Sequence, residues 1–177
     1  MRTAMIAVAA ALSFAGAARG EVVDAQPNGF EVRRSVEIAA PAAKVWAALG
    51  QPAAWWDSGH SWSGDAKNLS IDLKPGGCWC EALPKTGGGA LHMTVIFVDP
   101  GKTLRLAGAL GPLSMSGADG HMVWSLAEKG PTTTLTWTYD VGGYFKGGLD
   151  KRAGPVDGVL GAQVARLKAY VETGKPE

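Results

Sequence analysis

The stretch that decides the fold is VEIAAPAAKVW, residues 36–46, in which the pattern of a strand is followed directly by that of a helix. Apolar residues occupy even positions across residues 29–40, with mostly polar residues between them, which is the alternation of a half-buried strand. Pro41 suits the first turn of a helix and Gly50 suits the end of one. The sequence therefore predicts a strand followed at once by a short helix.

A run of β-like segments follows a second short helix expected over residues 52–57. Turn signals rich in glycine and proline separate the segments, and such short connections favour antiparallel neighbours. The expected strands cover residues 68–73, 77–83, 90–98, 103–109, 119–127 and 132–140. The last element, residues 155–171, carries an apolar stripe at helical spacing, which predicts an amphipathic helix.

This order of elements predicts an α+β fold. A curved antiparallel sheet of about seven strands would grip the long C-terminal helix, with two short helices after the first strand. A sheet followed by a single long helix buries both apolar faces only by wrapping around that helix. Such an arrangement encloses a pocket between the sheet and the helix.

The chain resembles the SRPBCC superfamily, also called START-like or Bet v 1-like helix-grip proteins, over about residues 29–173. Three segments carry the resemblance in order: residues 36–46, LKPGG at 73–77 and VDPGKTL at 98–104. Within the superfamily the chain is most similar to the polyketide cyclase and Hsp90-ATPase-activator-homologue group. The resemblance implies the fold more than a reaction, because this fold hosts binders, carriers and enzymes.

The N-terminus has the pattern of a secretory signal peptide. Arg2 is followed by an apolar, alanine-rich run, and Ala18-Arg19-Gly20 offers small residues where a signal peptidase cleaves. We therefore expect a signal peptide over residues 1–20, a flexible segment over 21–28 and a C-terminal tail over 174–177. The mature protein would be periplasmic or secreted.

Charge narrows the classes of partner. Without residues 1–20 the chain holds 15 basic and 16 acidic side chains, since two of its 17 basic residues and none of its 16 acidic residues fall there. No basic excess remains to attract nucleic acid, and no later apolar run is long enough for stable membrane insertion. A monomer and a homodimer paired through an edge strand both remain open.

Seven tryptophans are the most conspicuous candidates for ligand contacts, because large rings often line pockets. The leading hypothesis is an exported protein that binds a small apolar molecule between the sheet and the last helix. The expected contacts are Trp55, Trp56, Trp62, Trp79, Trp124, Tyr144, Val156 and Leu160.

The alternative is a cyclase- or hydrolase-like enzyme that uses the same cavity. Asp57 and His60 lie three residues apart and could form an acid–base pair. Glu81 shares a strand face with Trp79; a strand glutamate is usually solvated, but on a cavity face it would be a buried acid. The sequence leaves open whether any reaction is catalysed.

A metal or redox site at Cys78 and Cys80 is the third hypothesis. In the expected hairpin Cys80 lies nearly opposite His92, and His60 could close over them, giving a set suited to zinc or copper. A register slip of one residue would move His92 to the other face. On a regular strand the two cysteine Cα atoms would be about 6.6 Å apart, which makes a disulfide awkward without a bulge. Both cysteines could instead be small buried residues, so no cofactor is required.

Overall fold

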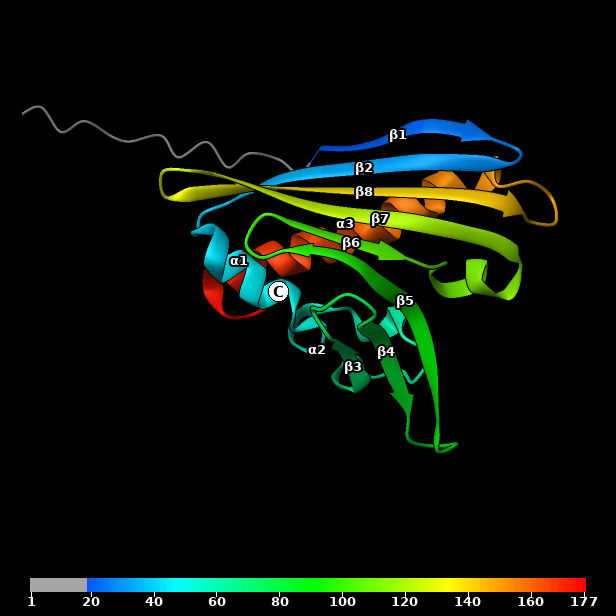
Figure 1. Cartoon of the computed structure of the whole chain (residues 1–177), viewed down its shortest axis with the longest axis horizontal. Helices are drawn as coiled ribbons and strands as arrows, with labels where there is room; N and C mark the ends of the chain where they lie inside the picture. Colours follow the sequence, from blue (N-terminus) through cyan, green and yellow to red (C-terminus); the bar gives the residue numbers. More distant parts are fainter. Residues whose placement is uncertain (1–18) are drawn as a thin grey trace, which may run out of the picture.

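The computed structural model describes residues 19–177, which form one curved, open antiparallel sheet and a long C-terminal helix (Figure 1). The strands are β1 Arg19–Gln26, β2 Gly29–Ile38, β3 Leu69–Ile71, β4 Cys78–Leu83, β5 Gly88–Asp99, β6 Thr103–Ala107, β7 Gly117–Lys129 and β8 Thr132–Tyr144. The α-helices are α1 Ala42–Leu49, α2 Pro52–Trp55 and α3 Asp150–Thr173. Three short 3₁₀ segments are η1 Ser58–His60, η2 Ala66–Asn68 and η3 Gly111–Met115.

The sheet has the order β1-β2-β8-β7-β6-β5-β4-β3. Every neighbouring pair is antiparallel. Strand β2, early in the chain, pairs with β8, the last strand. Figure 1 shows α3 crossing behind β8, β7 and β6, with α1 and α2 near its C-terminal end. The predicted α+β class and the helix gripped by a curved sheet are confirmed. No helix within residues 19–177 is both long and apolar enough to span a membrane.

The strand-to-helix stretch forms as predicted. Pro41 is extended and occupies the N-cap position of α1, and the backbone N–H of Gly50 closes the helix on Trp46 at 3.3 Å. The helix buries Val45 and Leu49 in the core. Apolar side chains at every second residue of the strand, and at every third or fourth residue of the helix, thus point into the same core.

The sheet has eight strands instead of about seven. The additional strand, β1, includes most of the segment 21–28 that we expected to be flexible, and it pairs with β2 along its length. Its apolar residues Val22 and Val23 are adjacent and exposed at the sheet edge, so no alternation marked it as a strand. The predicted signal peptide lies outside the described residues except for its last two positions.

Helix α3 begins five residues earlier than predicted. Pro155 was expected in the first turn but lies inside the helix, whose first residue is Asp150. The fully buried Leu149 precedes it and donates its backbone N–H to the carbonyl of Pro27 at 2.9 Å. Tertiary contacts thus stabilise helical residues before Pro155, although proline usually occupies the first turn of a helix.

One ion pair fixes α3 against the sheet. Arg34 of β2 donates from Nε to Asp157 Oδ1 at 2.6 Å and also donates to the Asp157 backbone carbonyl at 2.9 Å. Gly161 leaves room for this arginine, because a Cβ atom there would lie 2.7 Å from the guanidinium carbon. The position of α3 along β2 is therefore fixed by a charged contact as well as by apolar packing.

Five tryptophans form a closed ring in the core. Successive ring centroids are 5.6 Å apart for Trp55–Trp56, 5.1 Å for Trp56–Trp79, 5.6 Å for Trp79–Trp124 and 4.6 Å for Trp124–Trp137. Trp137 then meets Trp55 at 6.4 Å in an edge-to-face contact. These spacings are typical of favourable aromatic pairs, so the ring joins α2 to β4, β7 and β8.

Candidate functional site

A pocket of about 430 Å³ lies between α3, the sheet and the segments around η1 and η3. Most of its surface is apolar, and its polar lining is limited to a few side chains. The residues that line it are Trp56, Gly59, His60, Ser61, Trp62, Leu69, Trp79, His92, Leu110, Gly111, Pro112, Leu113, Tyr139, Phe145, Arg152, Pro155, Val156, Val159 and Leu160.

Five of the eight residues predicted to contact a ligand line this pocket: Trp56, Trp62, Trp79, Val156 and Leu160. The other three do not. Trp55 and Trp124 are fully buried parts of the tryptophan ring, and Tyr144 is 73% exposed at the end of β8. A core indole and a pocket indole cannot be told apart from sequence, because both occupy apolar positions in the pattern.

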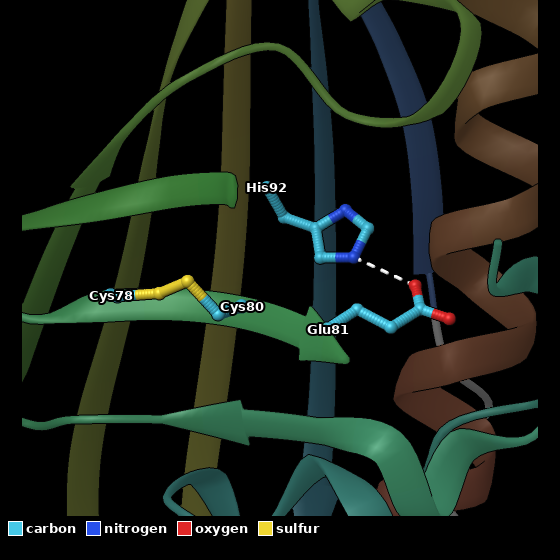
Figure 2. The surroundings of a disulfide bond; sticks show 4 residues. All are labelled: Cys78, Cys80, Glu81 and His92. Atoms are coloured by element: carbon cyan, nitrogen blue, oxygen red, sulfur yellow. Dashed lines mark hydrogen bonds and ion pairs between the residues drawn. A yellow bond between two sulfur atoms is a disulfide. The ribbon is translucent and has the colours of Figure 1, made fainter. Parts of the chain in front are cut away.

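A buried carboxylate and an imidazole meet at the pocket wall. Glu81 of β4 is 1% exposed, and one of its oxygens lies 2.9 Å from His92 Nε2 on β5 (Figure 2). The same carboxylate accepts backbone hydrogen bonds from Trp62 at 3.0 Å and from Ser63 at 2.5 Å. The common reading of a strand glutamate as a solvated charge is therefore wrong here: Glu81 ties the 62–63 segment and His92 to the sheet.

The environment of Glu81 favours its charged form. Burial alone would raise the pKa of this carboxyl group, but hydrogen bonds from Ser63, Trp62 and His92 outweigh the burial and lower the pKa. An ionised acid therefore stands directly behind the imidazole that lines the pocket. Such a partner orients the ring and fixes which of its nitrogens faces the carboxylate.

The predicted register between β4 and β5 is wrong by one residue. We expected Cys80 opposite His92, but Cys80 pairs with Leu91 and Trp79 pairs with Met93. His92 is the additional residue of a bulge between these pairs, and its side chain contacts Glu81 instead of the cysteines. The bulge was invisible in the sequence because no glycine or proline marks it.

Cys78 and Cys80 are joined by a disulfide, with their Cα atoms 5.4 Å apart (Figure 2). The irregular pairing beside them accompanies a shorter Cα separation than a regular strand would give. Within residues 19–177 no cluster of three or more side chains suited to a metal ion is present. The structure therefore does not bring together the set Cys78, Cys80, His92 and His60.

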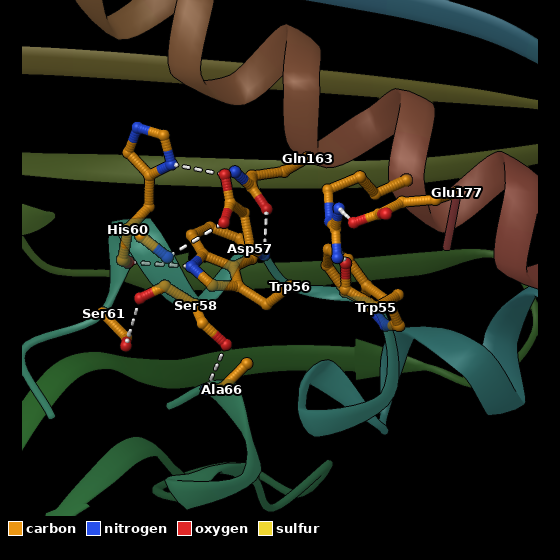
Figure 3. Close-up of polar contacts among 11 residues, drawn as sticks. Trp55, Trp56, Asp57, Ser58, His60, Ser61, Ala66, Gln163 and Glu177 are labelled. Carbon is orange, nitrogen blue, oxygen red and sulfur yellow. Dashed lines mark hydrogen bonds and ion pairs between the residues drawn. The ribbon is translucent and has the colours of Figure 1, made fainter. Parts of the chain in front are cut away.

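The predicted Asp57–His60 pair is in contact at the pocket rim. His60 Nδ1 lies 3.2 Å from Asp57 Oδ2, and both side chains are about two-fifths exposed (Figure 3). A backbone hydrogen bond from Gly59 is the main reason that the pKa of Asp57 is lowered, with His60 adding to it. The backbone N–H of Asp57 donates to the buried Gln163 of α3 at 2.9 Å, which holds the rim against the helix.

Tyr139 closes the pocket at η3. Its hydroxyl donates to the carbonyl of Gly108 at 3.1 Å and accepts from the backbone N–H of Leu110 at 2.9 Å. Burial raises the pKa of this hydroxyl, against a smaller opposing effect of the hydrogen bond from Leu110. The phenol therefore stays neutral and positions the loop that carries Leu110.

Tyr139, Phe145 and Arg152 were not expected to line the pocket, and His92 was not expected to pair with Glu81. Arg152 is exposed in the first turn of α3, and its guanidinium carbon lies 4.7 Å from the Phe145 ring centroid. Phe145 lies in the loop before α3, and its contact with Arg152 was missed because the start of α3 was placed too late.

Comparison with known proteins supports the same architecture. Residues 29–172 match the family described as polyketide cyclase/dehydrase and lipid transport. The search for similar curated proteins finds no significant match.

Among solved structures, CalU16 from Micromonospora echinospora has a TM-score of 0.60 at 15% identity, covering 91% of this chain and 87% of its own. DynU16, a protein of the dynemicin biosynthetic locus, has a TM-score of 0.57 at 23% identity, covering 82% of this chain and 48% of its own. A conserved protein of Enterococcus faecalis, EF2215, has a TM-score of 0.55 at 20% identity, covering 89% of this chain and 78% of its own. These likenesses show the fold. The family match spans most of the sequence, and the chain therefore belongs to the polyketide cyclase/dehydrase and lipid transport family of the SRPBCC superfamily.

Proposed function

We propose that this protein is exported and binds a small, mostly apolar molecule in the pocket beside α3. The observation that carries the proposal is a largely apolar pocket of about 430 Å³ with a single buried acid–imidazole pair in its wall. This volume is within the range of pockets that take small organic ligands, about 300–1,000 Å³. The predicted signal peptide supports export.

His92 supplies the polar contact in this proposal. Its Nε2–H donates to Glu81, so in the neutral imidazole Nδ1 remains to accept a hydrogen bond from a hydroxyl group of the ligand. Trp56 and Trp79 both line the pocket, and their rings are in edge-to-face contact with centroids 5.1 Å apart. A ligand with an aromatic or alicyclic body and a hydroxyl substituent that reaches His92 fits this combination best.

An enzyme that uses the same pocket is the alternative, and the Glu81–His92 pair is the observation that favours it. An imidazole backed by a carboxylate can take up and return a proton during a cyclisation or dehydration. The Asp57–His60 pair lies at the exposed rim, where water screens it. Turnover of the bound molecule would distinguish this alternative from binding alone.

Filling the pocket should weaken binding strongly without unfolding the protein. Val159 lines the pocket from α3 and is only partly buried, so the ring introduced by Val159→Trp would occupy ligand space. We expect the affinity for the neutral fluorescent probe N-phenyl-1-naphthylamine to fall at least about tenfold, since roughly 1.4 kcal/mol of lost contact suffices. Fluorescence titration measures it.

Ala165→Trp is the matched control, because Ala165 is exposed on the same helix and does not line the pocket. Its probe affinity should equal that of the wild type. Equal affinities for all three proteins would mean that the probe binds elsewhere and would contradict the proposed pocket.

A further inference from the structure

The pocket lining has an asymmetric set of charges. Among the described residues that line it, Arg152 is the only one with a permanent charge, and none is a carboxylate. The two remaining titratable groups of interest are the imidazoles of His60 and His92. An otherwise apolar pocket that carries a single guanidinium favours one sign of charge in its ligand.

Arg152 is held at the pocket by a ring rather than by an acid. Its guanidinium carbon is 4.7 Å from the centroid of Phe145, and both residues line the pocket. Within residues 19–177 Arg152 forms no ion pair, whereas Arg33, Arg34 and Arg166 each pair with a carboxylate. Stacking on Phe145 covers one face of the guanidinium and leaves its N–H donors at the edge available.

Within the described part of the chain no acid lines the pocket, and the two acids that contact its histidines, Glu81 and Asp57, are already engaged by hydrogen-bond donors. Glu81 accepts from two backbone N–H groups and contacts His92. Asp57 accepts from the backbone of Gly59 and contacts His60. Asp150 belongs to the same helical turn as Arg152 but does not line the pocket. Among the described residues, Arg152 is therefore the one permanently charged side chain that lines the pocket and could contact a bound ligand.

We infer that the ligand of this pocket is an amphipathic acid, with its apolar body among the indoles and its carboxylate on Arg152. This inference rests on the proposed binding function and specifies its chemical class. A guanidinium can donate two parallel hydrogen bonds to one carboxylate, which gives both affinity and orientation. Aromatic acids and short fatty acids share this chemistry.

The test compares two ligands of equal shape and different charge, 2-naphthylacetate and 2-naphthylacetamide, by isothermal titration calorimetry at low ionic strength. The wild type should bind the acid about tenfold more tightly than the amide, as a charge-assisted hydrogen bond is worth more than a neutral one. Arg152→Gln should remove most of that preference. Raising the salt concentration should weaken it in the wild type, because the pocket is open to solvent at this residue.

Lys151→Gln is the matched control. It removes one positive charge from the adjacent exposed residue, which does not line the pocket, and it should leave the acid-to-amide ratio unchanged. A wild type that binds both compounds equally would overturn this inference and leave the proposed function standing. A loss of the preference in Lys151→Gln as large as in Arg152→Gln would overturn it too. Failure of both compounds and of N-phenyl-1-naphthylamine to bind would overturn the proposed function itself.

Discussion

Glu81→Gln should lower the free energy of unfolding by about 3 kcal/mol, because it weakens a buried carboxylate with several charge-assisted hydrogen bonds. Both carboxylate oxygens accept from backbone N–H groups, of Trp62 and of Ser63. An amide offers one oxygen, and its NH₂ group would face a backbone donor. Urea denaturation measures the difference. Glu31→Gln is the control, since within residues 19–177 Glu31 pairs only with the exposed Arg33, and it should change stability by less than about 1 kcal/mol.

The same variant should alter the dependence of stability on pH. The pKa of Glu81 is lowered from its ordinary value of 4.5, so its contribution is fully present above pH 4.5 and is lost as the pH falls through the lower folded-state pKa. The stability difference between the wild type and Glu81→Gln should therefore be constant near neutral pH and shrink below about pH 4.5. A difference that persists unchanged to pH 3, or no difference at pH 7, would contradict the role assigned to Glu81.

Trp124→Ala should have a comparable or larger effect, about 3–5 kcal/mol, because it removes one member of the tryptophan ring. Trp124 is 1% exposed and contacts Trp79 and Trp137. Its indole N–H has no hydrogen-bond partner within the described residues, so the loss is one of packing alone. Urea denaturation gives the magnitude, and near-ultraviolet circular dichroism should report the loss of aromatic order.

Trp62→Ala is the control for that prediction. Trp62 is 49% exposed at the pocket and stands outside the ring, so its replacement should change the free energy of unfolding by no more than about 1 kcal/mol. If both variants were equally stable, the ring would contribute nothing beyond surface packing and its assigned role would be wrong.

Periodicity predicted most of this fold. The alternation of residues 29–40, the proline that opens α1 and the apolar stripe of α3 each reflect local rules that the core reinforces. The start of α3 was misplaced because Pro155 is accommodated inside the helix, against its usual position. Strand β1 was missed because edge strands need backbone pairing more than an apolar face.

The candidate site was harder to predict, since it depends on register. The Asp57–His60 contact follows from a spacing of three residues and was anticipated. The Glu81–His92 contact spans a hairpin and a bulge. Because the predicted register was wrong by one residue, we expected His92 beside Cys80, whereas its side chain contacts Glu81. Arg152 enters the pocket only because α3 starts at Asp150.

The most direct test of the central claim is native mass spectrometry of the protein, purified without a chelator from the cells that produce it. We expect an additional mass of one small organic molecule on the folded protein, absent from Val159→Trp and present on Ala165→Trp. A bare protein mass, under conditions in which added N-phenyl-1-naphthylamine also fails to bind, would contradict the binding function. A mass excess of one zinc or copper ion that is lost in Cys78→Ser would instead support the metal hypothesis.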